Sequence, residues 1–238
     1  MKRVEKYFVK WYNLSHKIIK NNTLNLGGIK MGINLGSMMN NMRSNTTDNG
    51  VNALNLKKND VLNLTKKNPG LKKVILGAGW DVASIGQDFD LDIAAFLLND
   101  NGKVQNIPDD VIFFNNMQGQ GIYLEGDNRT GAGDGDDEKI SVDLDKLSPK
   151  CDKVIFALNI YDAVSRKQNF SKVKNAYIRI LNEDNGNKEI CRYNLSEDGG
   201  NNTALLFAEL QRVNGSWQFK AKGELLQATV KSLADMYK

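Results

Sequence analysis

ISVDL, residues 140–144, alternates apolar and polar side chains without a break. Successive side chains of a β-strand point to opposite faces of the sheet, so this alternation is typical of a strand with one buried face. CRYNL, residues 191–195, repeats the same pattern. Both segments therefore predict half-buried strands, and the rest of the chain can be read outward from them.

About ten such runs follow one another after Ala53, each roughly four to nine residues long and separated from the next by Gly, Asn, Asp or Pro. Strands are predicted at 61–64, 72–79, 91–98, 111–114, 140–144, 154–161, 176–181, 189–195, 205–213 and 217–221. Hairpin turns are expected at 182–187 and 214–215, and the helical spacing of apolar residues over 225–238 predicts a closing helix. The predicted fold class is all-β, a β-sandwich of about ten strands with a C-terminal helix.

The first 52 residues differ in composition from the remainder. Apolar residues near the start recur at spacings of three and four, which predicts a short amphipathic helix, and residues 21–52 are rich in Asn, Gly, Met and Ser, as in a linker. Residues 1–80 carry 14 Lys or Arg and three acids, whereas residues 81–238 carry 18 and 25. We expect two parts: a basic N-terminal extension over 1–52 and a β-sandwich domain over 53–238.

The basic segment has two interpretations. It either meets an anionic partner, such as a membrane surface, nucleic acid or an acidic protein, or it is a solvated lysine-rich segment. No run of 18 apolar residues and no apolar signal-peptide core occur. Cys151 and Cys191 are 40 residues apart and form no CxxC pair, so neither a disulfide framework nor a zinc site follows, and both are expected to be small buried side chains. A cytoplasmic protein is expected.

The densest polar feature is the loop between Glu125 and Glu138. It contains six carboxylates and one cation, Arg129, with glycines between them. Such a loop repels itself unless a positive charge joins it, and its hard oxygen ligands suit a divalent cation, above all calcium. The alternative is that the loop is an acidic surface segment in water.

A second acidic motif, DFDLD at residues 88–92, precedes this loop. In an extended chain its three aspartates share one face, where like charges are destabilising without a cation. Asp134 and Asp136 have the same spacing, and neither motif fits the EF-hand pattern. A calcium site here would therefore draw its ligands from loops that are distant in sequence.

These motifs occur in the order found in TerD-type proteins, the tellurium-resistance and stress-response family. The resemblance covers roughly residues 53–238. The matching segments are GWD (79–81), FDLD (89–92), AAFLL (94–98), FFNN (113–116), GDN (126–128), GDGDDE (133–138), IYDA (160–163), QNF (168–170), NAYIR (175–179), YNLSED (193–198) and WQF (217–219). The first fifty or so residues do not align with a typical TerD protein.

The resemblance implies a β-sandwich whose end loops bind Ca²⁺, acting without enzymatic activity in a stress response that includes tellurite tolerance. It also implies partners among other proteins of a stress-response complex, which the basic segment would bring to the inner face of a membrane. Neither nucleic acid nor a small-molecule substrate is expected. The metal ligands that it indicates are Asp90, Asp92, Asp127, Asn128, Asp134, Asp136, Asp137 and Glu138, with Asp81 and Glu197 as weaker members of the set.

Two other readings of the chemistry are less favoured. A metal-dependent hydrolase would use the same carboxylates. No catalytic base or substrate pocket can be assigned from the sequence, however. The one histidine, His16, precedes the predicted domain, which argues against a Ser-His-Asp or Cys-His arrangement. Trp80 and Trp217 are interpreted as packing residues rather than ligand platforms.

A first prediction follows from the acidic loop. Replacing Asp134 and Asp136 together by Asn should sharply weaken calcium binding, whereas Lys238→Ala should leave it unchanged. Calcium added to chelator-treated protein should release heat and raise the melting temperature, with a stabilisation of roughly 2.7 kcal/mol at a hundredfold excess over Kd. Absence of both heat and melting shift would contradict a calcium site.

Overall fold

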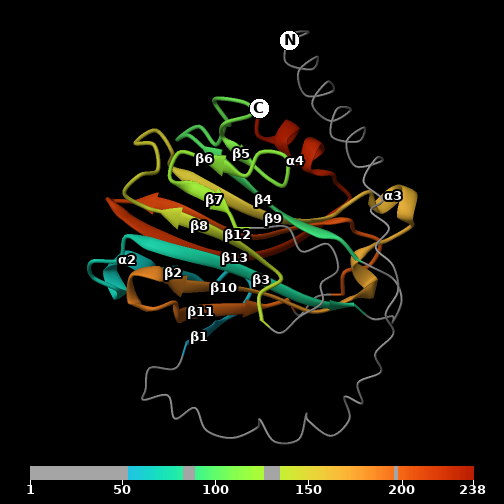
Figure 1. Cartoon of the computed structure of the whole chain (residues 1–238), viewed down its shortest axis with the longest axis horizontal. Helices are drawn as coiled ribbons and strands as arrows, with labels where there is room; N and C mark the ends of the chain where they lie inside the picture. Colours follow the sequence, from blue (N-terminus) through green and yellow to red (C-terminus); the bar gives the residue numbers. More distant parts are fainter. Residues whose placement is uncertain (1–52, 83–88, 126–134, 196–197) are drawn as a thin grey trace, which may run out of the picture. The chain divides into compact units, whose positions relative to one another are not determined.

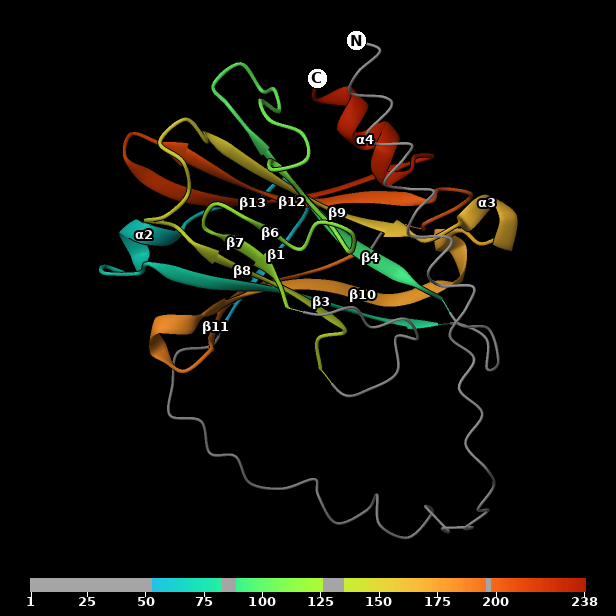
Figure 2. The ribbon, with the colours of Figure 1, turned by 45° about the horizontal axis from the view of Figure 1, so that its top comes forward.

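The computed structural model describes residues 53–82, 89–125, 135–195 and 198–238, which fold as one unit that begins at Ala53. The predicted helix and linker within residues 1–52 lie outside this description. In the described residues two β-sheets pack face to face, and a short helix lies on the outer face of one of them (Figures 1 and 2). The predicted all-β sandwich with a C-terminal helix is confirmed.

The first sheet has seven strands in the order β1-β11-β10-β3-β8-β7-β6 among the residues described. All neighbours are antiparallel except β1 and β11, which run parallel. The strands are β1 (Leu54–Leu56), β3 (Lys73–Val82), β6 (Gln118–Gly119), β7 (Ile122–Leu124), β8 (Glu138–Asp143), β10 (Val173–Asn182) and β11 (Lys188–Asn194).

The second sheet has six described strands in the order β2-β13-β12-β9-β4-β5, all antiparallel. They are β2 (Val61–Asn63), β4 (Leu91–Leu98), β5 (Val111–Ile112), β9 (Lys153–Ile160), β12 (Ala204–Val213) and β13 (Ser216–Leu226). The helical segments are α2 (Leu64–Lys67), α3 (Ala163–Arg166), η2 (Phe170–Lys172), η3 (Glu183–Asn185) and α4 (Val230–Met236).

Each of the ten predicted runs contains a strand of the structure, and both predicted hairpin turns are present. Sequence analysis missed β1, β6 and β7, which have three, two and three residues. The predicted helix over 225–238 was wrong at its start. Leu225 and Leu226 end β13, and the helix begins after Thr229, whose hydroxyl accepts a hydrogen bond from Ser232 N in a capping box.

The core lies between the two sheets, where alternate residues of each strand meet. β4 and β9 form a further apolar layer with α4 on their other face, through Phe96, Ile155 and Leu233. Every residue of β4 is consequently buried, including Asp92. Trp80 and Trp217 are 3% and 6% exposed, and both cysteines are buried, as predicted.

A β-bulge shapes the middle of the second sheet. Ala208 pairs with Ala221, but Leu206 pairs with Glu224, so β13 holds one extra residue. Gly223 takes up the bend with φ +65°, and a Cβ at this glycine would overlap the hydroxyl of Tyr193 from the opposite sheet. Phe207 of β12 also lies in the core, where its ring meets that of Tyr193 edge-on at 5.6 Å.

We predict that Gly223→Ala destabilises the protein more than Gly215→Ala. Both glycines have positive φ, +65° and +73°, so each alanine carries a similar backbone strain of about 1–2 kcal/mol. Only Gly223 has a buried side chain against it, which adds about 1–3 kcal/mol of overpacking. Urea unfolding of both variants measures the difference, and equal midpoints would show that Tyr193 does not confine this bulge.

Candidate metal site

One end of the sandwich gathers the predicted acidic residues. The end of β3 and the starts of β8 and β10 lie there in the first sheet, and the start of β4 lies beside the end of β9 in the second. The described residues that flank segments 83–88, 126–134 and 196–197 all lie at this same end, which we call the acidic end. Figure 1 shows it beside α3.

The two sheets are joined here by Glu138, the first residue of β8. Its Oε2 accepts a hydrogen bond of 2.6 Å from the backbone N of Ile93 on β4, and its side chain is buried. Asp92 is the neighbour of Ile93 and is 3% exposed, and Asp90 is 9% exposed. The structure thus places buried carboxylates from two separate acidic motifs at the same end of the sandwich.

Asp137 caps the first sheet. Its backbone N donates to Ala78 O at 2.8 Å, and its Oδ2 accepts from Trp80 N at 2.8 Å, where the pairing of β3 with β8 has ended. Burial raises the pKa of Asp137, the hydrogen bond from Trp80 opposes this, and the nearby charges of Asp81 and Asp136 add to the increase. A cation at this end would favour the charged form.

Asp136 points away from these groups and is held by Arg179 of β10. Arg179 Nε lies 2.7 Å from Oδ1 and Nη2 lies 3.0 Å from Oδ2, a two-bond pair with the carboxylate fully buried. The hydroxyl of Tyr177 is 3.0 Å from the same Oδ1, and burial followed by the charge of Asp136 raises its pKa to about 12. Gly77 makes room, since a Cβ there would overlap the Asp136 carboxylate.

Asp81 is bound in a similar way from β10. It is exposed, and its Oδ2 accepts a hydrogen bond of 2.7 Å from Asn175 Nδ2. Asn175, Tyr177 and Arg179 therefore form a polar stripe that engages Asp81 and Asp136. Sequence analysis quoted this segment as NAYIR but assigned it no role, although its i, i+2 spacing is the signal that could have revealed it.

A second arginine, Arg166 of α3, reaches Asp90. Its Nη1 lies 3.6 Å from Asp90 Oδ2, and the two side chains are 36% and 12% exposed. The Arg166 guanidinium also lies over the ring of Tyr161, 5.0 Å from its centre. Sequence analysis did not single out Arg166 either.

The predicted ligands thus separate into groups. Asp90, Asp92 and Glu138 are each buried at the acidic end, Asp137 caps β3, and Asp81 and Asp136 are engaged by β10. Within the ranges that the structure describes, no three Asp, Glu, His or Cys side chains are placed to hold an ion by themselves. The remaining predicted ligands lie outside the described residues, and these are Asp127, Asn128, Asp134 and Glu197.

The position of Asp136 also changes how its substitution should be interpreted. In the double Asn variant of Asp134 and Asp136, loss of the Arg179 ion pair would accompany any loss of a metal ligand. A substitution that tests metal binding alone must leave Asp136 in place.

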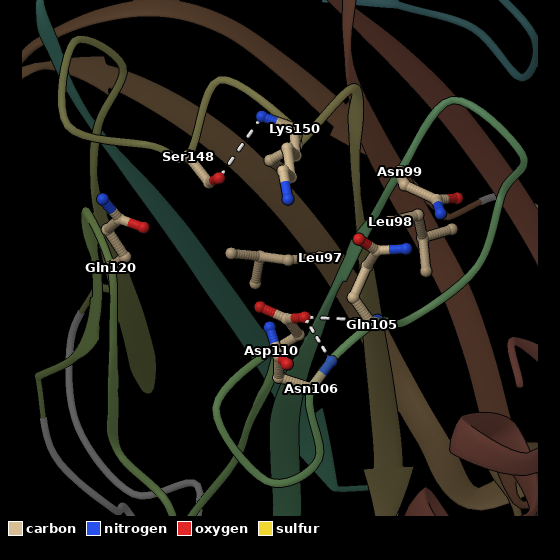
Figure 3. A pocket seen from close by; sticks show the side chains of 10 residues that line it. Leu97, Leu98, Asn99, Gln105, Asn106, Asp110, Gln120, Ser148 and Lys150 are labelled. Atoms are coloured by element: carbon tan, nitrogen blue, oxygen red, sulfur yellow. Dashed lines mark hydrogen bonds between the residues drawn. The ribbon is translucent and has the colours of Figure 1, made fainter.

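A cavity of about 70 Å³ lies at the other end of β4, beside Leu97 and Leu98 (Figure 3). Asp110 anchors one wall, since its Oδ2 accepts hydrogen bonds from the backbone N of Asn106 at 2.8 Å and of Gln105 at 3.2 Å. Burial raises the pKa of the adjoining Cys151 to about 11, so this thiol stays protonated at neutral pH and is a weak nucleophile. The eight residues of β4 separate this cavity from the acidic end.

None of the helices in the described part of the chain has the length and apolar character needed to span a membrane.

We predict that Glu189→Gln lowers stability near neutral pH and makes stability less sensitive to acid. Burial alone would raise the pKa of Glu189, but hydrogen bonds from Arg192 at 3.0 Å and Arg179 at 2.9 Å outweigh it and hold the pKa below its ordinary 4.5. A lowered folded-state pKa stabilises above the unfolded value, and this stabilisation is lost as the pH falls through the folded value.

Urea midpoints at about pH 7 and about pH 3 would test this. The urea midpoint of Glu189→Gln should be lower than that of the wild type at the higher pH, and the two midpoints should approach each other at the lower pH. Glu183→Gln, at an exposed glutamate, is the matched control. If Glu189→Gln had the same urea midpoint as the wild type at neutral pH, the contacts of Glu189 with Arg179 and Arg192 would not be stabilising.

Comparison with known proteins shows which proteins share this fold and these motifs. The TerD domain model matches residues 53–237. The tellurium resistance protein TerD of Serratia marcescens is 45% identical over 188 residues, which cover 78% of this chain and 97% of that protein. General stress protein 16U of Bacillus subtilis is 44% identical, over 77% of this chain and 96% of that protein.

A solved structure agrees with these sequence matches. The crystal structure of a homologue of the telluride resistance protein TerD from Streptomyces coelicolor superimposes with a TM-score of 0.58 and 25% identity, over 71% of this chain and 99% of that one. The match with the family model, the sequence identities and the shared sandwich lead to one conclusion: this chain belongs to the TerD family.

Proposed function

We propose that this protein is a non-enzymatic calcium-binding module of a stress response, in which Ca²⁺ held at the acidic end supports protein interaction or assembly. Relatives in the family are named for tellurium resistance and for general stress. The hydrogen bond between Glu138 Oε2 and Ile93 N carries the proposal, because it brings the acidic starts of β8 and β4 to one place.

The donor chemistry of the acidic end fits calcium. Asp90, Asp92 and Glu138 offer carboxylate oxygens, the ligands that hard cations prefer. Sulfur ligands are distant in the fold: Cys151 lies beside the cavity at the far end of β4, and Cys191 is fully buried within β11. Buried carboxylates are costly unless their charge is compensated, so a divalent cation would stabilise this arrangement.

In this proposal Asp90, Asp92 and Glu138 hold the ion together with groups from the neighbouring segments, namely Asp127, Asn128, Asp134 and Glu197. Asp137 lies beside them as the cap of β3. Asp136 and Asp81 support the site from the outside through Arg179 and Asn175. When bound, calcium supplies positive charge that joins loops of both sheets.

The proposed partners are other proteins of the stress response. The basic residues of the first 52 positions would bring the module to the anionic inner face of a membrane by charge attraction. Binding between folded proteins, rather than turnover of a substrate, is the activity that this arrangement serves.

We expect Asp92→Asn to weaken calcium binding by at least about tenfold, because it removes a buried charged oxygen ligand. Asp145→Asn is the matched control. Asp145 belongs to the same domain, but its side chain is 65% exposed and its Oδ2 lies 3.7 Å from Lys72 Nζ. Its replacement should therefore leave the calcium affinity within about twofold of the wild type. Calorimetric titration of chelator-treated protein gives both affinities.

A parallel melting experiment separates binding from folding. Calcium should raise the melting temperature of the wild type and of Asp145→Asn more than that of Asp92→Asn. The proposal would be abandoned if the wild type took up no calcium, or if magnesium bound at least as tightly and the chain then turned over a phosphoester.

A further inference from the structure

The two arginines at the acidic end hold their carboxylates in different ways. Arg179 makes two hydrogen bonds of 2.7 and 3.0 Å to Asp136, whose side chain is fully buried, and a third of 2.9 Å to Glu189. Arg166 makes one contact of 3.6 Å with Asp90, beyond hydrogen-bond length, and is itself 36% exposed. Arg179 therefore holds Asp136 by hydrogen bonds, whereas Arg166 lies near Asp90 without forming one to it.

Arg166 also contacts an aromatic ring. Its guanidinium lies 5.0 Å from the centre of the Tyr161 ring, within the range of a cation–π contact. The Tyr161 ring is in turn packed edge-on against Phe114 at 5.6 Å, and the Tyr161 backbone N donates to Asp90 O at 2.8 Å. The Arg166 guanidinium thus contacts Asp90 and the Tyr161 ring at the same time.

The segment that carries Arg166 is lightly packed. α3 has four residues, of which Ala163 alone is buried, and Val164 is 82% exposed. A change in the position of Arg166 would disturb little of the core.

We propose that Arg166 is an internal counter-ion for Asp90 that a divalent cation displaces, so that Arg166 sets the calcium affinity of the acidic end and links occupancy to α3. This inference rests on the proposed function, because it requires the ion to bind at Asp90. An arginine and a calcium ion repel each other when both lie against one carboxylate. Displacing the arginine therefore opposes calcium binding, and removing it strengthens binding.

The affinity test compares Arg166→Gln with Lys167→Gln in the full-length chain, by calorimetric titration of chelator-treated protein with calcium. Both substitutions remove one positive charge from adjacent positions, but of these two side chains Arg166 is the one whose guanidinium lies 3.6 Å from the Asp90 carboxylate. Arg166→Gln should bind calcium about two- to tenfold more tightly than the wild type, whereas Lys167→Gln should stay within about twofold of it.

The second measurement follows the arginine side chains of the wild type by ¹H–¹⁵N NMR during the same titration. The Nε resonance of Arg166, assigned by its absence in Arg166→Gln, should shift as calcium binds. The Arg179 resonance should stay in place, since Asp136 and Glu189 hold that guanidinium. This measurement needs no variant to be stable beyond the one used for assignment.

Both results are required. Equal or weaker affinity in Arg166→Gln, an equal gain in Lys167→Gln, or an unmoved Arg166 resonance would each overturn displacement while calcium binding itself stood. If neither the wild type nor Arg166→Gln took up calcium, the proposed function would fail, and displacement would fail with it.

Discussion

The acidic end depends on how three consecutive acids at the start of β8 direct their side chains. Glu138 crosses to the backbone of Ile93 in the other sheet, Asp137 caps β3 at Trp80, and Asp136 turns outward to Arg179. Each carboxylate thereby meets a backbone N–H or a cation, which a buried acid requires. These contacts anchor the start of β8, and the one made by Glu138 joins it to the second sheet.

Close packing beneath these groups explains the neighbouring glycines. The outer face of β3 carries Gly77 and Gly79 in the rows below Asp136 and Tyr177, and a Cβ at either position would overlap those side chains. Asp136 and Tyr177 can therefore pack directly on the backbone of β3, because Gly77 and Gly79 have no side chains. Gly223 has the same use on β13, where it admits Tyr193 beside the bulge.

Arg179 and Arg166 differ in how strongly they are held at the acidic end. Arg179 belongs to a buried network with Asp136 and Glu189, so its loss would leave buried charges uncompensated. Arg166 makes a longer and more exposed contact, of the kind that contributes little to stability and is readily exchanged. In our proposal, stability and the response to calcium are therefore carried by different cations at the acidic end.

The sequence by itself determined the fold class, the position of ten strands and the acidic character of the candidate site. Alternation of polar and apolar residues has a fixed relation to strand geometry, so ISVDL at 140–144 could be assigned directly. LDIAAFLL at 91–98 could be assigned as a short, almost wholly apolar run. The order of short motifs was also enough to place the chain in its family. Three short strands, β1, β6 and β7, were not predicted.

Only the tertiary structure decided what each acid does. Asp136 and Glu138 are two positions apart and look equivalent in sequence, yet one lies against Arg179 and the other against Ile93, 45 residues away in the chain. Those partners come from strands that pairing and sheet packing bring together, and no local pattern encodes the contact. For the same reason the roles of Arg166 and Arg179 emerged only when β10 and α3 were in place beside the acidic end.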